Sequence, residues 1–369
     1  MKILAKCAVL ALRTVYFVFK IFLKPTEKIT FLSRQSNTPS LDFTLLKEGL
    51  MQIGCDKKIV MLCKKIPHSL TGKLLYAFHM LEQMYHIATS KVLIVDGYSI
   101  AVCVLKHNKQ TKVVQIWHAL SALKKFGFQS VGTKAGSNKD VAKILCMHKN
   151  YDFVLAPSEI TAGYYKQAFG INDSQIKYLG IPRIDYILKK DAEKSKKIYD
   201  EYPILKQKTN IIYIPTFRKN QPLLIEEFIE KLDTSKYNLI VKLHPLDEIT
   251  PRPQKSGVIY DNLFEVYDLA KICDKIITDY SSLAMEVSLL EIPTYFYVYD
   301  LEEYKQSPGI NFDFEAEEMG IYKAETAKEL LALLEKEYDK EILKRFKEKY
   351  ITVDTNDCAK RLAEFIVSM

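Results

Sequence analysis

The chain has 369 residues, of which 48% are hydrophobic and 27% are charged, with only 13 glycines and 13 prolines. This length fits two domains, and the composition excludes collagen-like, low-complexity and mostly disordered chains. Five of the eight net positive charges lie in the first 24 residues, which contain no acid, so the rest of the chain is nearly balanced. A nucleic-acid-binding protein would carry its basic residues more broadly, and we expect no nucleic-acid partner.

The first predicted element is an amphipathic helix within residues 1–26. On a helix its cationic side chains fall within about 40° of one another and the remaining arc is apolar: Lys2, Lys6, Arg13, Lys20 and Lys24. These charges interrupt every apolar run, which argues against a transmembrane helix, and no small-residue cleavage site follows as in a signal peptide. We expect residues 2–24 to lie on an anionic membrane surface, which makes the protein peripheral at the cytoplasmic face of the cell membrane. A helix packed on the protein itself is the alternative.

Two sets of short apolar, β-branched runs follow, with helical stretches between them. The first set is 58–63, 92–96, 113–117, 153–156 and 176–179, and the second is 210–214, 239–243, 257–260, 275–278 and 294–298. Such runs predict parallel sheets covered on both faces, hence two Rossmann-like domains of five strands each. A lysine-rich polar stretch at 189–210 joins them, and amphipathic helices are expected at 328–336 and 340–349. The predicted domains are 27–205 and 206–369, after the helix at 1–26.

Ligands of such sheets bind beyond the carboxyl ends of the strands, and polar residues recur at those points. His118 follows the run at 113–117, where a histidine can act as a general base near neutral pH. Lys124 and Lys125 come shortly after it and can attract a phosphorylated ligand. A histidine satisfied within the fold and two solvated lysines are the alternative reading of the same residues.

The second set of runs ends in further candidate phosphate-binding groups. Arg218 follows Pro215, and its guanidinium can fork onto phosphate oxygens. His244 follows another run and is stopped by Pro245. Ser281 and Ser282 precede a helical stretch, where free backbone N–H groups favour an anion. A salt-bridged arginine, a turn histidine and plain N-capping serines are the corresponding structural alternatives.

In combination these motifs resemble the CDP-glycerol glycerophosphotransferase family, the teichoic acid primases and polymerases of Gram-positive cell envelopes. The resemblance covers roughly residues 92–315 and rests on the order of the motifs: His118 with Leu123-Lys124-Lys125-x-Gly127, Gly180-x-Pro182-Arg183-x-Asp185, Pro215-Thr216-Phe217-Arg218, Leu243-His244-Pro245, Asp279-Tyr280-Ser281-Ser282, and the segment 297–304 followed by 311–315.

The resemblance implies a GT-B fold, with two Rossmann-like domains whose parallel sheets face a central cleft. It implies transfer of glycerol phosphate or ribitol phosphate from CDP-glycerol or CDP-ribitol to a lipid-linked glycan or teichoic acid acceptor, with release of CMP. His118 matches the family's catalytic base, and His244 is the second expected catalytic residue. The remaining matches are to donor-binding positions: Arg218, Asp279, Ser281, Ser282 and Glu286. No Asp-x-Asp motif lies near them, so no protein-bound metal or other cofactor is expected.

One departure from the family pattern concerns the acceptor. The family commonly has His-Gly-Thr-Pro at the catalytic strand end, whereas this chain has His118-Ala119-Leu120-Ser121. The change leaves the acceptor and the choice between glycerol and ribitol phosphate open, and the chain length favours a primase over a polymerase. Two other functions stay open at this point: a GT-B glycosyltransferase that uses a nucleotide sugar, since the same groups suit any nucleoside diphosphate, and a non-catalytic membrane-bound scaffold.

Overall fold

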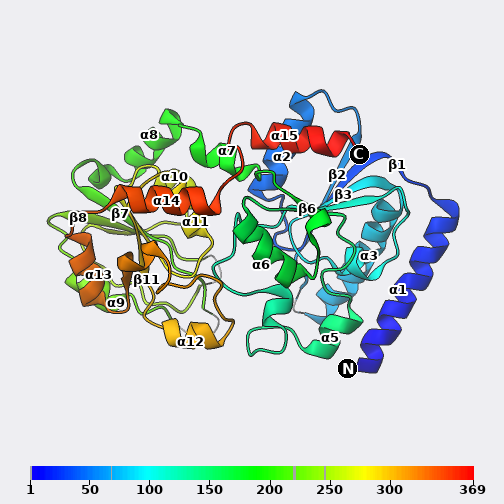
Figure 1. Ribbon diagram of the computed structural model, residues 1–369, viewed down its shortest axis with the longest axis horizontal. Helices are drawn as coiled ribbons and strands as arrows, with labels where there is room; N and C mark the ends of the chain where they lie inside the picture. Colours follow the sequence, from blue (N-terminus) through cyan, green and yellow to red (C-terminus); the bar gives the residue numbers. More distant parts are fainter. Residues whose placement is uncertain (1, 68, 219–221, 245–246) are drawn as a thin grey trace. The chain divides into compact units, whose positions relative to one another are not determined.

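The structure of the protein, a computed structural model, describes residues 2–67, 69–218, 222–244 and 247–369 (Figure 1). It divides into two compact units. The first comprises residues 1–120, 125–185 and 352–369, and the second comprises 121–124 and 186–351. Within the described ranges, no helix combines the length and the apolar character that crossing a bilayer requires.

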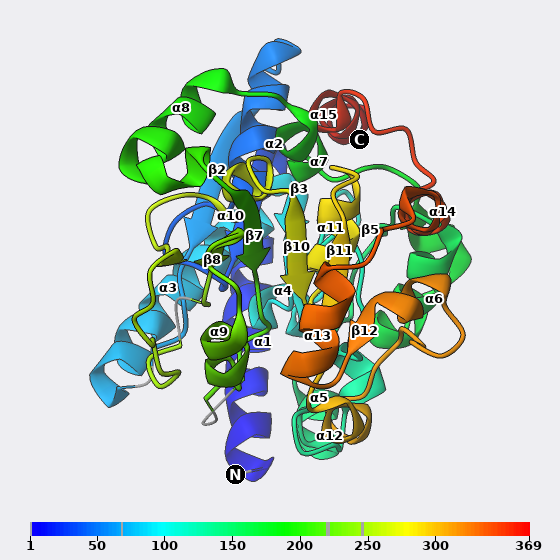
Figure 2. The ribbon, with the colours of Figure 1, turned by 90° about the vertical axis from the view of Figure 1, so that its left-hand side faces the viewer.

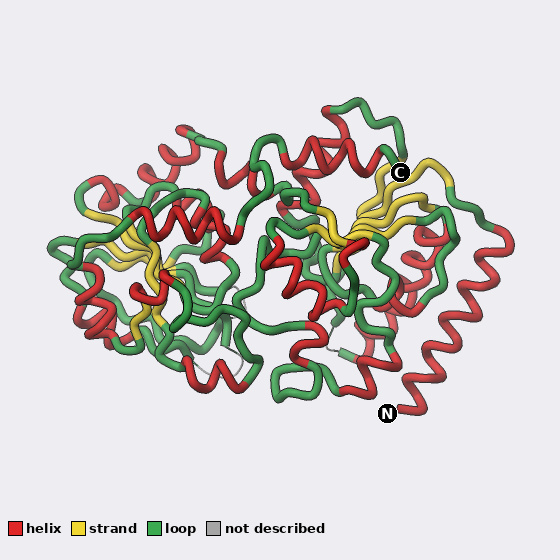
Figure 3. Tube along the Cα trace, in the orientation of Figure 1, coloured by secondary structure: helices red, strands yellow, loops and turns green. Residues whose placement is uncertain are grey.

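The first unit is built on a six-stranded parallel sheet in the order β2-β1-β3-β4-β5-β6. Its strands are β1 (Thr26–Ser33), β2 (Lys58–Cys63), β3 (Ser90–Val95), β4 (Lys112–Gln115), β5 (Phe153–Leu155) and β6 (Ile176–Lys177). Its helices are α1 (Lys2–Phe22), α2 (Leu41–Gln52), α3 (Leu70–Ala88), α4 (Ile100–Val104), α5 (Lys139–Ile144), α6 (Glu159–Phe169) and α15 (Cys358–Val367). Figure 3 shows the strands of this unit as one layer with helices on both sides.

The second unit repeats this plan with a sheet in the order β12-β11-β10-β7-β8-β9. Its strands are β7 (Thr209–Tyr213), β8 (Tyr237–Val241), β9 (Val258–Tyr260), β10 (Lys275–Thr278), β11 (Thr294–Tyr297) and β12 (Lys323–Ala324) (Figure 2). Its helices are α8 (Ala192–Glu201), α9 (Glu226–Lys231), α10 (Val266–Ala270), α11 (Leu283–Ser288), α12 (Leu301–Gln306), α13 (Ala327–Leu334) and α14 (Lys340–Tyr350), and the chain enters this unit within α7 (Arg183–Leu188).

All ten predicted strands are present, and each sheet has one more. The sequence gives no clear sign of β1, because only its second half is apolar and it begins with charged residues. Yet Ile29, Phe31 and Leu32 are almost fully buried, and the strand lies between β2 and β3. The charge of Lys28 is accommodated by hydrogen bonds to the Thr89 hydroxyl and to the His86 ring, 3.2 Å away.

The structure divides the chain at other points than the predicted boundary at 205/206. The lysine-rich stretch expected as a linker contains α8, which belongs to the second unit and buries Ile198. The last residues return to the first unit, because Asp185 accepts hydrogen bonds from the backbone N–H groups of Cys358 and Ala359, both at 2.8 Å. Helix α15 then packs against α2.

Candidate active site

His118 lies beyond the carboxyl end of β4, in a turn whose conformation is fixed by the preceding residues. Trp117 has φ of 58°, a left-handed conformation that is costly for a large residue, and its backbone N–H donates to the Gln115 side chain at 2.9 Å. The Gln115 amide in turn donates to the Gly97 carbonyl at 3.0 Å. This turn leaves the His118 side chain exposed, with its ring 4.1 Å from that of Trp117.

The tautomer of His118 follows from its contact with the neighbouring strand end. Nδ1 lies 2.9 Å from the backbone carbonyl of Asp96, the residue after β3. The Gln35 side-chain nitrogen also lies near Nδ1, at the longer distance of 3.4 Å. Because a carbonyl can only accept, the shorter contact assigns the proton to Nδ1 and the lone pair to Nε2. A histidine fixed in this way can take a proton through Nε2, as the predicted role of a general base requires.

Asp96 and Arg34 are two polar residues at this edge that the sequence analysis did not select. Arg34 follows β1, Asp96 follows β3 and His118 follows β4, and these three strands are neighbours in the sheet. The rule that ligands gather at strand ends would have selected Asp96, the last residue of the predicted run at 92–96. It could not have selected Arg34, since β1 was not predicted.

The second unit holds Arg218 in a closed ionic network at the carboxyl ends of β7, β10 and β11. Its guanidinium donates to Asp300 through Nε (2.6 Å) and Nη2 (2.9 Å), and through Nη1 to Asp279 and to the Thr216 carbonyl, both at 2.8 Å. Four of the five N–H groups are therefore occupied, and the residue is only 7% exposed. Three tyrosine rings lie within 6 Å of the guanidinium: Tyr280, Tyr299 and Tyr304.

Asp279 ties the loop after β7 to the loop after β10. Its carboxylate accepts from the Thr216 backbone N–H at 2.9 and 3.0 Å and from the Thr216 hydroxyl at 2.6 Å, in addition to Arg218. Asp300, which lies in the segment 297–304, also accepts from the Tyr280 hydroxyl at 3.0 Å. The structure thus gives Arg218 and Asp279 partners within the protein, and one guanidinium N–H has no acceptor among the described residues.

The other predicted donor-side residues differ in their surroundings. His244, beyond β8, is exposed, and its ring lies 5.2 Å from that of Phe217; Pro245 lies outside the described residues. Ser281 and Ser282 do stand at the start of α11, and Ser282 is its N-cap without a side-chain capping bond. Glu286 is 2% exposed and accepts from the Tyr267 hydroxyl at 2.6 Å, which places its carboxylate inside the unit.

The two predicted lysines belong to different units. The residues 121–124 pack with the second unit, where Asn311 donates its backbone N–H to the Leu123 carbonyl at 2.6 Å. The side chain of Lys124 is exposed to solvent, but many protein atoms lie around it. The resulting desolvation lowers the pKa of Lys124, although the negative charge of Asp279 acts in the opposite direction. Lys125 is exposed in the first unit with His118. In the described parts of the chain, no three histidine, cysteine or acidic side chains converge as a metal site would need.

Comparison with known proteins gives consistent matches over most of the chain. Residues 14–368 match the family model described as CDP-glycerol:poly(glycerophosphate) glycerophosphotransferase. The chain is 32% identical over 359 residues to the teichoic acid ribitol-phosphate primase of Bacillus spizizenii, covering 93% of this chain and 91% of that protein. It is 36% identical over 240 residues to the teichoic acid glycerol-phosphate primase of Bacillus subtilis, covering 63% and 62%.

A solved structure shares the fold over the whole chain. The wall teichoic acid polymerase TagF, in a variant form, superposes with a TM-score of 0.72 and 18% identity, covering 100% of this chain and 96% of that one. This likeness confirms the predicted GT-B type of fold with two parallel-sheet units.

Proposed function

Since the chain belongs to the CDP-glycerol:poly(glycerophosphate) glycerophosphotransferase family, we propose that it transfers glycerol phosphate or ribitol phosphate from the CDP-activated polyol to a hydroxyl of a lipid-linked glycan or teichoic acid acceptor. Family membership makes the protein a transferase of the kind that the motifs predicted. The observation that carries the proposal is the family match over residues 14–368 together with a histidine in a fixed tautomer at a strand end.

The proposed reaction is a single phosphoryl transfer. The acceptor hydroxyl oxygen attacks the phosphorus next to the polyol, the bond from that phosphorus to the bridging oxygen breaks, and CMP leaves with the electron pair. The proton of the hydroxyl goes to Nε2 of His118. Such a reaction depends on positioning and charge neutralisation more than on covalent help from the protein.

The second unit supplies the proposed donor site. We propose that the diphosphate is bound by His244, by the hydroxyls of Ser281 and Ser282 and by Lys124. A further donor is the N–H of Arg218 that has no acceptor among the described residues. Asp279 then contributes by holding Arg218 and Thr216 in place, and the buried Glu286 by holding Tyr267. Lys125 remains a proposed source of attraction for the acceptor.

The names of the relatives include both glycerol phosphate and ribitol phosphate, so both polyols are candidate substrates. The primase from Bacillus spizizenii, whose name gives ribitol phosphate, covers nearly all of this chain, whereas the glycerol-phosphate primase from Bacillus subtilis is more identical over a shorter stretch. The 91% coverage of the former favours a primase, which adds one or a few units, over a polymerase.

We also propose that the first unit lies on the cytoplasmic leaflet of the membrane, through apolar side chains of the predicted helix together with others from α3. In α1, Arg13 donates to the Val104 carbonyl at 2.9 Å and Lys20 to the Lys106 carbonyl at 3.0 Å, so the middle of the cationic stripe faces the protein. Apolar side chains of α1 beside this stripe are exposed. Helix α3, which lies beside α1 (Figure 1), adds further exposed apolar side chains. We call these residues the α1–α3 face: Ile3, Leu4, Leu10, Phe17, Ile21, Phe22, Leu74, Leu75 and Phe78, each 58–79% exposed.

A membrane is the occupant that fits this face, because exposed cations lie at its rim. Lys6 and Lys24 are exposed near the two ends of α1, where they can reach lipid phosphates while the apolar side chains enter the acyl region. Lys2 is exposed too but pairs with Asp140 at 2.5 Å. Flotation with vesicles that contain anionic lipid tests this. We expect Leu10→Glu with Phe17→Glu to abolish flotation, and the matched pair Met51→Glu with Leu263→Glu, at similarly exposed positions elsewhere, to leave it intact. Equal flotation of both double variants would contradict membrane docking.

The transfer itself is tested by CMP release with alternative donors. The full chain is incubated with a lipid-linked disaccharide, with or without one glycerol phosphate unit, and with CDP-glycerol, CDP-ribitol or a UDP-sugar. We expect CMP release from at least one CDP-polyol and no UDP release. His244→Ala should lower kcat/KM for the donor by about 100-fold or more, since it removes a proposed phosphate contact. UDP release alone would indicate a glycosyltransferase, and no release from any donor would contradict the proposed function.

A further inference from the structure

A groove lies between the first half of α1 and the short helix α5, two helices of the first unit that pack against each other (Figure 1). Its lining comes from positions 2, 6, 9, 10 and 13 of α1, which share one side of that helix, and from positions 140, 143 and 144 of α5. Its volume is about 480 Å³, within the range of small-molecule sites. This α1–α5 groove is therefore large enough for a ligand and belongs to a single unit.

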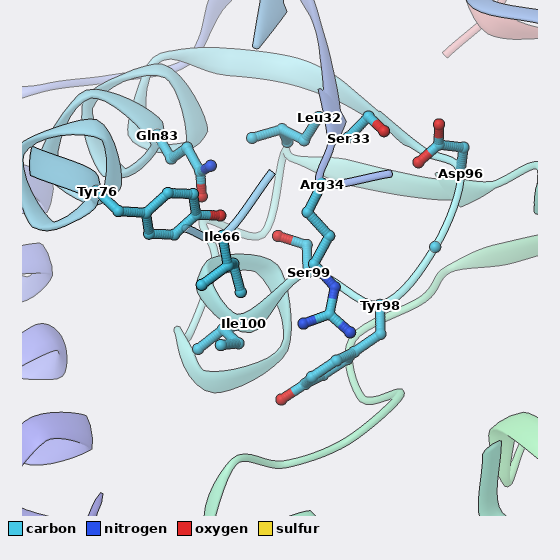
Figure 4. Close-up of a pocket in the computed structure, with 11 residues that line it drawn as sticks. Leu32, Ser33, Arg34, Ile66, Tyr76, Gln83, Asp96, Tyr98, Ser99 and Ile100 are labelled. Carbon is cyan, nitrogen blue, oxygen red and sulfur yellow. The ribbon is translucent and has the colours of Figure 1, made fainter. Parts of the chain in front are cut away.

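The pocket beyond β1 and β3 of the same unit is too small for such a ligand (Figure 4). Its volume is about 10 Å³, which gives room for about one water molecule. Asp96, which lines it, is 1% exposed, and burial raises the pKa of its carboxyl to about 6. The half-buried guanidinium of Arg34 lies over the Tyr98 ring, 4.8 Å from the ring centroid. A ligand larger than water fits the α1–α5 groove and not this pocket.

Four cations line the α1–α5 groove against one acid. The positive side chains come from both helices: Lys2, Lys6, Arg13 and Lys143. The acid is Asp140, whose carboxyl has a lowered pKa, first because Lys2 donates a hydrogen bond to it and also because of the charges of Lys143 and Lys6. The excess of positive charge favours an anion in the groove.

Two of these cations are open to a ligand. Lys2 is engaged by Asp140 at 2.5 Å, and Arg13 donates through Nε to the Val104 carbonyl at 2.9 Å. Lys6 and Lys143 are exposed, and neither ammonium group has an acid or another hydrogen-bond acceptor among the described residues. Their N–H donors are therefore available to an anion that enters the groove.

The α1–α5 groove also has an apolar part, which decides what kind of anion fits. Val9, Leu10 and Ile144 line it together with the cations. Val9 is buried, whereas Leu10 is 66% exposed and belongs to the α1–α3 face. The groove therefore continues into the surface for which we propose contact with acyl chains. An anion with an apolar tail matches both parts of the groove, and a free phosphate ion matches only one.

We propose that the α1–α5 groove binds the head group of one anionic phospholipid, with its phosphate between Lys6 and Lys143 and the start of its acyl chains on Leu10. This inference rests on the proposed attachment to the membrane and deepens it, because it adds a discrete site to the general attraction of cations to an anionic surface. It does not depend on the proposed transfer reaction.

Binding of a single lipid molecule tests the groove without vesicles and without activity. The full chain is titrated calorimetrically with dihexanoyl phosphatidylglycerol below its critical micelle concentration, with dihexanoyl phosphatidylcholine and with inorganic phosphate. We expect phosphatidylglycerol to bind at one site per chain. The other two ligands should bind about tenfold or more weakly, because phosphatidylcholine has no net charge and phosphate has no apolar tail.

Charge-removing variants locate the bound lipid. Lys6→Gln and Lys143→Gln should each weaken phosphatidylglycerol binding about fivefold or more, since each removes a charge-assisted contact. The control Lys47→Gln removes an exposed cation of α2 and should bind as wild type. Equal affinities of wild type and Lys143→Gln would overturn the proposal. So would equal weakening by Lys143→Gln and Lys47→Gln, or equal binding of the two phospholipids.

Flotation separates a failure of this site from a failure of membrane docking. With vesicles of phosphatidylcholine and phosphatidylglycerol, the double variant Lys6→Gln with Lys143→Gln should need a higher fraction of phosphatidylglycerol for half-maximal flotation than Lys47→Gln does. Flotation of the wild type without saturable binding of the single lipid would overturn the groove and leave membrane docking in place. CMP release tests the transfer reaction separately from both.

Discussion

The carboxyl ends of the two sheets carry similar charged side chains but satisfy them in opposite ways. In the second unit Arg218 has two carboxylates, a carbonyl and three aromatic rings around it, and Asp279 accepts three protein hydrogen bonds from Thr216 alone. In the first unit Arg34 has an aromatic ring and no acid, and Asp96 has no hydrogen-bond donor among the described residues. The closed network fixes the loops that carry it, whereas burying the Asp96 carboxylate without a hydrogen-bond donor lowers the stability of the first unit. A charged residue in a motif is therefore by itself a weak indicator of a binding role.

The largest expected effect concerns the chemistry at the open edge. His118→Ala removes the proposed base but no group of the closed network, so we expect kcat to fall by about 10²–10⁴-fold with little change in unfolding temperature. CMP release and thermal unfolding measured on the same preparation check this. A variant that retains wild-type kcat would exclude His118 as the base.

The closed network should respond in stability instead. Asp279→Ala leaves the Arg218 cation buried with Asp300 alone, and breaking a buried pair typically lowers the free energy of unfolding by about 3–5 kcal/mol. The control Glu318→Ala breaks the exposed pair with Arg345 and should cost at most about 1 kcal/mol. Urea unfolding measures both, and similar losses in the two variants would contradict the difference between buried and exposed pairs.

Asp96→Asn should do the reverse and stabilise the protein. The native pKa of about 6 is above the ordinary value, so the folded protein binds the Asp96 proton more tightly than the unfolded chain does, and stability falls as pH rises from about 4 to about 6. The variant lacks this fall, which amounts to at most about 3 kcal/mol. Its advantage over wild type should thus grow between pH 4 and pH 6 and stay constant above. A difference that does not depend on pH would show that Asp96 is satisfied in solution.

The smallest expected effect separates a capping serine from a proposed binding serine. Ser158 accepts from the Thr161 backbone N–H at 3.2 Å as the N-cap of α6, so Ser158→Ala should cost about 1 kcal/mol of stability. Ser282 is an N-cap without such a bond, so Ser282→Ala should cost less and instead raise the donor KM several-fold. Unfolding and donor titration of the two variants check the distinction, which fails if Ser282→Ala leaves the donor KM unchanged.

The sequence predicted most of the fold because most strands are unbroken apolar runs. β10 (Lys275–Thr278) was placed at its observed bounds, and its residues 276–278 are fully buried. β1 was missed because the burial of Lys28 depends on Thr89 and His86, about 60 residues away, and no local pattern encodes that contact. The short β12 has only two residues and offers no periodicity at all.

The positions of the candidate site residues were predictable from the strand ends, but the partners of their side chains were not. His118 and Ser282 stand where the motifs put them. The partners of Arg218 come from Asp279 and Asp300, 61 and 82 positions further along the chain, so the sequence indicated a cation at the strand end but not that acids surround it. The unsatisfied state of Asp96 is likewise a property of the packed structure alone.

The mass of the acceptor after reaction is the measurement that decides what the protein does. A lipid-linked disaccharide bearing one glycerol phosphate unit is incubated with CDP-glycerol or CDP-ribitol and the full chain, and both the acceptor and the released nucleotide are analysed. We expect the acceptor to gain one glycerol phosphate or one ribitol phosphate for each CMP released, and His118→Ala to abolish both changes. CMP release without any gain in acceptor mass, or an unchanged acceptor with both donors, would contradict polyol phosphate transfer.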